Sequence, residues 1–169
     1  MLKIDLENHK EICVLFVCMG NICRSPTAEA VFRYKAKIAG LEEMFHVDSA
    51  GTHNFHIGKS PDKRAVKVAD RRGYSMQELR ARQIHLSDFK KFQYILAMDN
   101  HNLTVLNQHC PSEQCHKLEL LMQYSGEFSG KKEVPDPYFG SYQNFEKVLT
   151  MIEKSMDGFL KHIQRKGIK

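Results

Sequence analysis

Apolar runs alternate with segments of helical periodicity along the chain. Residues 12–17, ICVLFV, are apolar throughout and rich in β-branched and aromatic side chains, as is typical of a strand buried on both faces. Residues 26–39 then place apolar side chains along one face of a helix. This alternation predicts βα repeats, in which helices cover both faces of a parallel sheet.

The pattern of apolar residues also predicts strands and helices in the rest of the chain. Strands are expected at residues 45–49 and 92–98, with a short edge strand at 132–134, and helices are expected at 62–72, 100–108 and 144–165. The apolar segment LELLMQY, residues 118–124, is predicted to be helical. The expected helix caps are Ser25 before the helix at 26–39, Gly40 after it, and Gly73 at the end of the next helix.

Length and composition fit one compact domain. The chain has 169 residues, of which 42% are hydrophobic, enough for a sizeable core. We take residues 1–11 as an N-terminal extension and residues 12–169 as the domain. The N-terminus carries no apolar signal segment, and the run ICVLFVCM is too short to span a bilayer, so no membrane partner is expected.

The number of cysteines and the net charge indicate a location for the protein and the kinds of partner it could bind. The five cysteines are an odd number and are not spaced like a secreted disulfide framework, which favours a reducing, cytoplasmic location. The net charge of +5 favours anionic partners. Because the basic residues are spread along the chain, with no basic stripe interleaved with aromatics, no nucleic-acid partner is expected.

The strand at 12–17 runs into CMGNICRS, residues 18–25. A buried parallel strand that enters a helix through a glycine-containing turn presents backbone N–H groups and the positive end of the helix dipole to an anion. Gly20 can adopt a positive φ, Asn21 tolerates the left-handed region and can brace the loop, and Arg24 can hold two phosphate oxygens. The stretch is therefore predicted to be a phosphate-binding loop.

Cys18 adds a nucleophile to this loop. Surrounded by amides, a helix dipole and a guanidinium, its thiol is expected to ionise more readily than that of a free cysteine. The hydroxyl of Ser25 can donate to the sulfur, and attack of the thiolate on a phosphate ester would give a cysteinyl-phosphate. The alternative, a small apolar residue at a strand end, leaves Gly20, Asn21 and Arg24 unexplained.

A leaving alkoxide or phenoxide needs a proton, so a general acid must come from elsewhere in the fold. Asp136 in VPDPYFG is the best candidate, because prolines on both sides stiffen its loop. A turn-forming Asp-Pro pair is the other interpretation of this residue, and the sequence alone leaves it open.

Five segments of the chain together resemble one known family: VLFVCMGNICRSPTAEAVF, VDSAGT, ARQI, FQYILAMD and DPYFG, in that order. They are similar to the motifs of the low-molecular-weight protein tyrosine phosphatases, from about Ile12 to the terminal helix. The resemblance implies a single-domain α/β fold, flavodoxin-like or phosphotyrosine phosphatase I-like, with a four-stranded parallel sheet flanked by helices. It also implies hydrolysis of phosphotyrosine in proteins without cofactor or metal, inhibition by phosphate and other oxyanions, and a monomer or weak dimer.

By the same resemblance, Cys18 is the nucleophile, Arg24 binds the phosphate, and Asp136 acts first as acid and then as base. Asp99 matches a position with a structural role, and isoleucine at position 22 is typical of the tyrosine-type enzymes rather than those acting on phosphoarginine. The other residues carried over are the phosphate loop and its support, Met19, Gly20, Asn21, Ile22, Cys23, Ser25 and Ser49, and the pocket walls, Phe55 and Tyr138.

Three positions carry further implications of the resemblance. Cys23 is the expected redox partner of Cys18, although a cysteine merely packed under the loop is an equal alternative. Phe139 stands where many relatives have a second tyrosine, and Leu79 where mammalian forms have a histidine. A regulatory phosphorylation at position 139 and a histidine–Asp99 interaction are therefore not expected here.

Other functions are open to the same residues. Arsenate reductases of similar fold share a cysteine–arginine loop and use a later cysteine pair, and Cys110 and Cys115 do follow the third predicted strand. With His109 and His116 these cysteines could instead suggest a metal site, but their spacing matches no standard zinc pattern. A non-catalytic module that binds phosphorylated partners is the third possibility.

Overall fold

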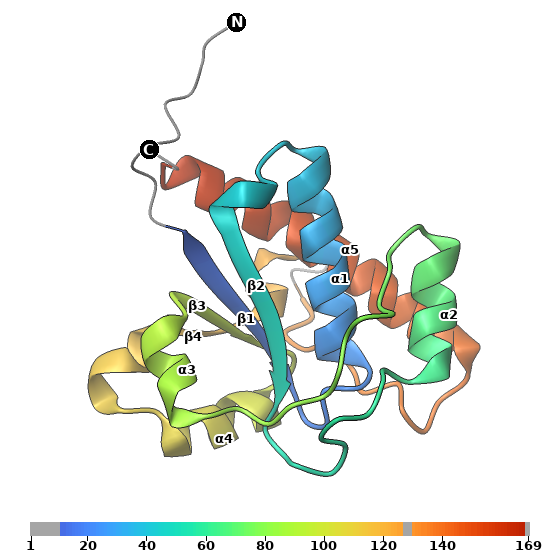
Figure 1. Ribbon diagram of the computed structural model, residues 1–169, viewed down its shortest axis with the longest axis horizontal. Helices are drawn as coiled ribbons and strands as arrows, with labels where there is room; N and C mark the ends of the chain where they lie inside the picture. The colour runs from blue at the N-terminus through green and yellow to red at the C-terminus, as the bar shows by residue number, and fades with distance from the viewer. Residues whose placement is uncertain (1–10, 127–129, 168–169) are drawn as a thin grey trace, which may run out of the picture.

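The computed structural model describes residues 11–126 and 130–167, and its centre is a sheet of four parallel strands. The strands are β1 (Ile12–Cys18), β2 (Phe45–Gly51), β3 (Tyr94–Ala97) and β4 (Leu118–Leu120), in the spatial order β2-β1-β3-β4. The four-stranded parallel α/β fold is thereby confirmed (Figure 1). The proposed N-terminal extension, residues 1–11, lies outside the described residues except for Glu11.

Helices cover both faces of the sheet, as expected (Figure 1). One face packs against α1 (Arg24–Ile38) and α5 (Tyr142–Arg165), with α2 (Lys63–Arg71) packed against these two helices, and the other face packs against α3 (Leu86–Lys91) and α4 (Asn100–His109). Short 3-10 helices are η2 (Glu42–Met44), η3 (Ser112–Lys117) and η4 (Leu121–Tyr124). None of the helices in the described part of the chain is long and apolar enough to cross a membrane.

The alternation of side chains along β1 decides where its last residue points. Leu15 and Val17 belong to the core cluster under α3 and α4, whereas Phe16 and Cys18 belong to the cluster under α1 and α5. Successive side chains of a strand point to opposite faces, so this division follows directly from the backbone. Cys18 is therefore delivered to the α1 side of the sheet, at the start of the loop that leads into α1.

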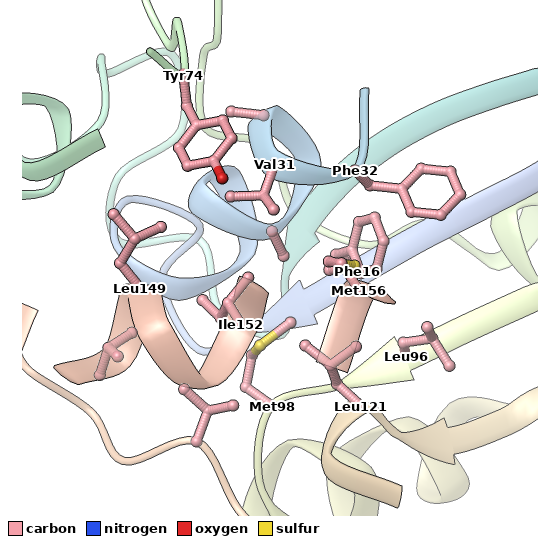
Figure 2. Packing of buried hydrophobic residues seen from close by; sticks show 14 of the residues in the cluster. Phe16, Val31, Phe32, Tyr74, Leu96, Met98, Leu121, Leu149, Ile152 and Met156 are labelled. Carbon is pink, nitrogen blue, oxygen red and sulfur yellow. The ribbon is translucent and has the colours of Figure 1, made fainter. Parts of the chain in front are cut away.

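An aromatic cluster anchors α1 and α5 on the sheet. The ring of Phe32 in α1 lies 5.9 Å from Phe16, 5.0 Å from Phe45 and 5.6 Å from Phe159 between ring centroids. Figure 2 shows Phe16 and Phe32 beside Met156 of α5, with further aliphatic residues filling the layer between the helices and the strands. Burying large aromatic side chains in this way supplies much of the stabilising free energy of a core.

Three sequence predictions about secondary structure are wrong. Residues 118–124 form the short strand β4 and the 3-10 helix η4 instead of one helix, because the first three residues pair with β3. Residues 132–134 are not a strand, although the Val134 N–H donates to the Met98 carbonyl at 2.8 Å. Ser25 is not an N-cap, because α1 begins at Arg24, two residues earlier than expected, with Cys23 in the capping position.

The glycines expected to end helices do so, and the other elements follow the prediction closely. Gly40 and Gly73 have φ values of 70° and 84°, in the left-handed region that glycine adopts most readily. The helix α3, only six residues long, was not predicted.

Gly158 of α5 provides a test of the packing between this helix and η4. A Cβ at this position would lie 1.9 Å from the carbonyl oxygen of Tyr124, a backbone atom that has little freedom to move. We expect Gly158→Ala to lower the free energy of unfolding by at least about 1–3 kcal/mol, despite the higher helix propensity of alanine. Urea denaturation would measure the change. Gly130→Ala, where a Cβ meets no atom within 4 Å, is the matched control, and an equal effect of both substitutions would contradict the packing argument.

Candidate active site

The loop between β1 and α1 curls around the sulfur of Cys18. The Asn21 N–H donates to Cys18 Sγ at 3.3 Å, and the Ser25 hydroxyl lies 3.0 Å from the same atom. Cys18 is nearly completely buried, with 3% of its surface exposed. The Ser25 hydroxyl has a second acceptor in the Ala50 carbonyl at 3.3 Å, so its hydrogen can serve either the sulfur or the backbone.

Asn21 holds the curl in place. Its φ of 55° is in the left-handed region, and it is the one non-glycine residue with a positive φ in the described ranges. The Nδ2 group donates to the hydroxyls of Ser25 at 2.8 Å and Ser49 at 2.9 Å, while Oδ1 accepts from the Arg82 N–H at 2.9 Å. These three bonds tie the loop to α1, to β2 and to the segment before α3, and they offset the cost of the strained backbone.

A buried carboxylate continues this network away from the pocket. The Ser49 hydroxyl donates to Glu29 Oε2 at 2.6 Å, and Arg33 donates to Glu29 Oε1 at 2.6 Å. Glu29 is 3% exposed, and burial raises the pKa of its carboxyl, with the hydrogen bond from Ser49 and the charge of Arg33 opposing the shift. A chain of hydrogen bonds thus runs from Glu29 through Ser49, Asn21 and Ser25 to the sulfur. Glu29 was not predicted from the sequence, because a glutamate four residues before an arginine is typical of an exposed helix face.

A glycine at the end of β2 allows the loop to approach. A Cβ at Gly51 would lie 2.7 Å from the carbonyl oxygen of Met19 and 3.2 Å from the backbone nitrogen of Asn21. The backbone around it is bonded to the loop as well, because the N–H groups of Thr52 and His53 donate to the carbonyls of Cys18 and Met19. The carboxyl ends of β1 and β2 therefore support the loop jointly.

Arg24 is a buried cation held by two carboxylates. Its Nη1 donates to Asp99 Oδ2 at 2.5 Å and to the Val134 carbonyl at 3.0 Å, and its Nη2 lies 3.4 Å from Asp136 Oδ2. Burial acts to lower the pKa of Arg24, but nearby Cys18, Asp99 and Asp136 outweigh it, so the pKa is raised. Asp99 also caps α4 by accepting from the Asn102 N–H at 2.7 Å.

The proline-flanked segment brings Asp136 to the loop from more than a hundred residues away. Its Oδ1 accepts from the Tyr138 N–H at 3.1 Å, and its side chain is 45% exposed, so the carboxyl faces the open space above Arg24. Residues 131–137 have no regular secondary structure, and the Val134 backbone contacts described above fix them against Met98, directly after β3, and against the guanidinium.

These groups surround a cavity of about 310 Å³, at the lower end of the range for small-molecule sites. Its lining comprises Cys18, Met19, Gly20, Ile22, Cys23, Arg24, Phe55, His56, Asp136, Tyr138 and Phe139. The structure therefore brings together all the residues predicted from the sequence as nucleophile, phosphate-binding arginine, acid and pocket walls. Asn21, Ser25 and Ser49 lie behind the loop and do not line the cavity.

Two lining residues were not assigned to the pocket from the sequence. His56 packs against Gly20, where a Cβ would lie 2.9 Å from its Cδ2 atom, and its ring centroid is 6.4 Å from that of Tyr138. Phe139 is 98% exposed and packs edge-on against Tyr138 at 4.9 Å. The pattern of the chain gave no signal for His56, because loop side chains are positioned by the fold rather than by periodicity.

Two of the other cysteines, Cys23 and Cys110, have thiols with a raised pKa. Burial, Asp62 and Cys18 all raise the pKa of the Cys23 thiol, which lies in the same loop, and no disulfide joins the two. Cys110 and Cys115 do not line the cavity, and burial together with the Cys115 thiol raises the pKa of Cys110 to about 12. Within residues 11–126 and 130–167, no group of three or more His, Cys, Asp or Glu side chains could hold a metal ion.

The fold and the cavity together define an α/β protein with a cysteine and an arginine in the loop between β1 and α1, at the floor of the cavity. A family profile described as low molecular weight phosphotyrosine protein phosphatase matches residues 13–169. A phosphatase of that name from Schizosaccharomyces pombe is 43% identical over 155 residues, covering 91% of this chain and 98% of its own length. The human enzyme of that name is 41% identical over 149 residues, covering 87% and 92%.

Solved structures agree with the sequence relatives. A protein tyrosine phosphatase from Entamoeba histolytica superimposes with a TM-score of 0.89 at 37% identity, covering 92% of this chain and 99% of the other. The chain belongs to the low molecular weight phosphotyrosine protein phosphatase family and is a protein-tyrosine phosphatase of that type. The resemblance stated from the sequence motifs is thereby confirmed.

The buried carboxyl of Glu29 predicts a pH dependence. Because its pKa is raised above the ordinary 4.5, the carboxyl binds a proton more readily in the folded protein than in the unfolded chain. That contribution to stability is fully present below pH 4.5 and is lost as the pH rises through the raised pKa. The side chain in Glu29→Gln does not titrate. Relative to this variant, the free energy of unfolding of the wild type should fall, as the pH rises through the raised pKa, by about 1.4 kcal/mol for each unit by which the pKa is raised.

Urea unfolding of both proteins from about pH 4 to about pH 8 would measure this difference. Groups other than Glu29 titrate in both proteins, so their contributions cancel. Glu43→Gln, at an exposed position in η2, is the control, and its difference from the wild type in the free energy of unfolding should not change with pH. A difference between wild type and Glu29→Gln that stays constant with pH would refute the assignment.

Proposed function

We propose that this phosphatase hydrolyses phosphotyrosine in proteins through a cysteinyl-phosphate intermediate on Cys18. The observation that carries the proposal is the single cavity in which the Cys18 thiol, the Arg24 guanidinium and the Asp136 carboxyl meet. A nucleophile, a clamp for developing negative charge and a proton donor are the three groups that displacement at a phosphate ester requires.

In the first step the thiolate of Cys18 attacks the phosphorus. The S–P bond forms as the bond from phosphorus to the tyrosine oxygen breaks, and Asp136 gives its proton to the departing phenolate. Arg24 and the N–H groups of the loop bind the equatorial oxygens, on which the negative charge is spread in the transition state. The Ser25 hydroxyl, 3.0 Å from the sulfur, can donate to the thiolate before attack.

In the second step Asp136, now ionised, takes a proton from water. The water oxygen bonds to phosphorus as the S–P bond breaks, and inorganic phosphate and the thiolate are released. The Ser25 hydroxyl stabilises the sulfur as it leaves. Asn21 and Ser49 support the loop throughout, through the hydrogen bonds that fix its curl. Phosphate and other oxyanions would compete for the same loop and inhibit the enzyme.

The walls of the cavity support an aryl substrate. Tyr138 and Phe55 are 38% and 62% exposed at the rim, where their rings could enclose the ring of a phosphotyrosine. Ile22 and Met19 add apolar surface on the loop side. The proposed site of action is cytoplasmic, where proteins carrying phosphotyrosine occur and thiols stay reduced.

Two substitutions test the assigned roles with p-nitrophenyl phosphate. Cys18→Ser should abolish turnover, because a neutral hydroxyl replaces the thiolate. Asp136→Asn, which keeps the size of the side chain but not its proton, should lower kcat about 10²- to 10⁴-fold with much less effect on KM. Wild-type turnover should persist in EDTA.

Cys115→Ser is the control, because this thiol lies outside the cavity and should leave turnover unchanged. Binding of a phosphotyrosine peptide without phosphate release by the wild type would favour a binding module instead. Thioredoxin-coupled arsenate reduction that is lost in Cys115→Ser would favour a reductase.

We further propose that Cys23 protects the nucleophile from peroxide. Hydrogen peroxide would oxidise the Cys18 thiolate to a sulfenic acid, and the Cys23 thiol would then condense with it, releasing water and forming a disulfide. Both thiols line the same cavity, which supports the pairing.

After a pulse of peroxide and then dithiothreitol, the wild type should recover most of its own starting activity. Cys23→Ser should recover several-fold less, because its sulfenic acid is oxidised onward to the irreversible sulfinic form. Assaying p-nitrophenyl phosphate turnover before and after treatment gives the recovered fraction. Equal recovery of the two proteins would exclude the protective role.

A further inference from the structure

The exposed face of α2 carries a row of cations. Lys63, Lys67 and Arg71 follow one another at intervals of four residues, so they lie on one side of the helix, and all three are exposed. The opposite side, with Ala65 and Val68, is buried against the core. We call Lys63, Lys67 and Arg71 the basic ridge. These three cations are separated from one another in the sequence, and they lie together only because the segment is a helix.

The basic ridge begins beside the active-site cavity. The N–H of Asp62, the residue before α2, donates to the carbonyl of Ile22 in the phosphate loop at 2.8 Å. The guanidinium of Arg64 lies over the Tyr138 ring at 5.6 Å and donates to the Gly140 carbonyl at 3.3 Å. The first turn of α2 is thus attached to the loop and to one wall of the pocket, and the ridge leads away from there along the helix (Figure 1).

A groove of about 710 Å³ runs along the basic ridge. Its lining comprises Ser60, Pro61, Lys63, Val66, Lys67, Asp70, Arg71, Met76 and Gln77. The groove therefore has apolar surface, three cations and a single carboxylate, that of Asp70. This composition suits a peptide that carries more than one negative charge.

The cations of the ridge are largely available to a ligand. Among the described residues no carboxylate lies within ion-pair distance of Lys63 or Lys67, and Lys67 rests on the Tyr142 ring at 5.2 Å. Arg71 is 3.8 Å from Glu146, at the outer limit of an ion pair, and that glutamate is bonded more closely to Arg72. An acidic partner would therefore not have to break an existing ion pair in order to bind Lys63 and Lys67.

We propose that the basic ridge binds an acidic segment of the phosphoprotein substrate adjacent to the phosphotyrosine. This inference rests on the proposed function, because it requires the phosphotyrosine to occupy the cavity. The ridge spans about 12 Å from Lys63 to Arg71 at the rise of an α-helix. An extended peptide covers that length with about four residues, so a run of about four acidic residues next to the phosphotyrosine matches it.

Two phosphotyrosine peptides that differ only in a flanking run of four glutamates or four glutamines test the proposal. Acidic runs are placed on the N-terminal side in one pair and on the C-terminal side in another. At low salt the wild type should show a kcat/KM about 10-fold higher for the acidic peptide of at least one pair. The preference should shrink as salt is added, because exposed ion pairs are screened.

The double variant Lys63→Glu/Lys67→Glu should abolish or reverse this preference while leaving kcat/KM for p-nitrophenyl phosphate unchanged. An acidic residue at the start of a helix is electrostatically favourable, so Lys63→Glu should not unfold α2. Lys63→Gln/Lys67→Gln is a milder second variant, for which a partial loss is expected. The matched control is Lys90→Glu/Lys91→Glu in α3, which makes the same change in net charge on the opposite face and should keep the preference.

Equal kcat/KM for both members of each pair in the wild type would overturn the proposal while leaving the proposed function standing. A control variant that loses the preference as fully as the ridge variant would overturn it too, since net charge alone would then explain the effect. Failure of the wild type to hydrolyse p-nitrophenyl phosphate and every peptide would instead overturn the proposed function, and this inference with it.

Discussion

The left-handed backbone of Asn21 is the constraint on which the site depends. Only five residues connect the end of β1 to the start of α1, and within that length the chain has to turn back so that the Asn21 N–H points toward the Cys18 sulfur. A non-glycine residue at φ 55° is unfavourable by itself, and it is stabilised here by bonds to Ser25, Ser49 and the Arg82 backbone. Because those partners come from three separate parts of the chain, the loop takes its shape only when the fold is complete.

Segments with a strong hydrophobic pattern could be predicted from the sequence, whereas the three-residue β4 and the six-residue α3 could not. β1 is apolar throughout, and α5 repeats its apolar positions over 24 residues, so both were identified correctly. β4 has three residues and α3 has six, too few for a period to appear in the pattern. The error at Ser25 has a different cause, since its hydroxyl is engaged by Cys18 and Asn21 rather than by the first turn of α1.

Some residues of the candidate site could likewise be predicted from the sequence, and others could not. Cys18 and Arg24 are close in sequence, and their residue types alone indicate the chemistry, whereas Asp136 was placed with them chiefly through a family resemblance. Glu29 and His56 escaped notice because their importance arises from burial and from loop position, which no local pattern records. Residues that act through tertiary contacts are the ones that sequence reasoning misses.

Asp99 fixes the geometry of Arg24. One oxygen of this carboxylate binds the guanidinium and the other caps α4, while the Val134 carbonyl fixes the same nitrogen from a second direction. A long, flexible side chain ordinarily loses conformational entropy when it grips an anion. Here that loss has occurred during folding, so an oxyanion bound as proposed would meet a cation that is already ordered and oriented, and most of the entropy lost on association would be that of the anion itself.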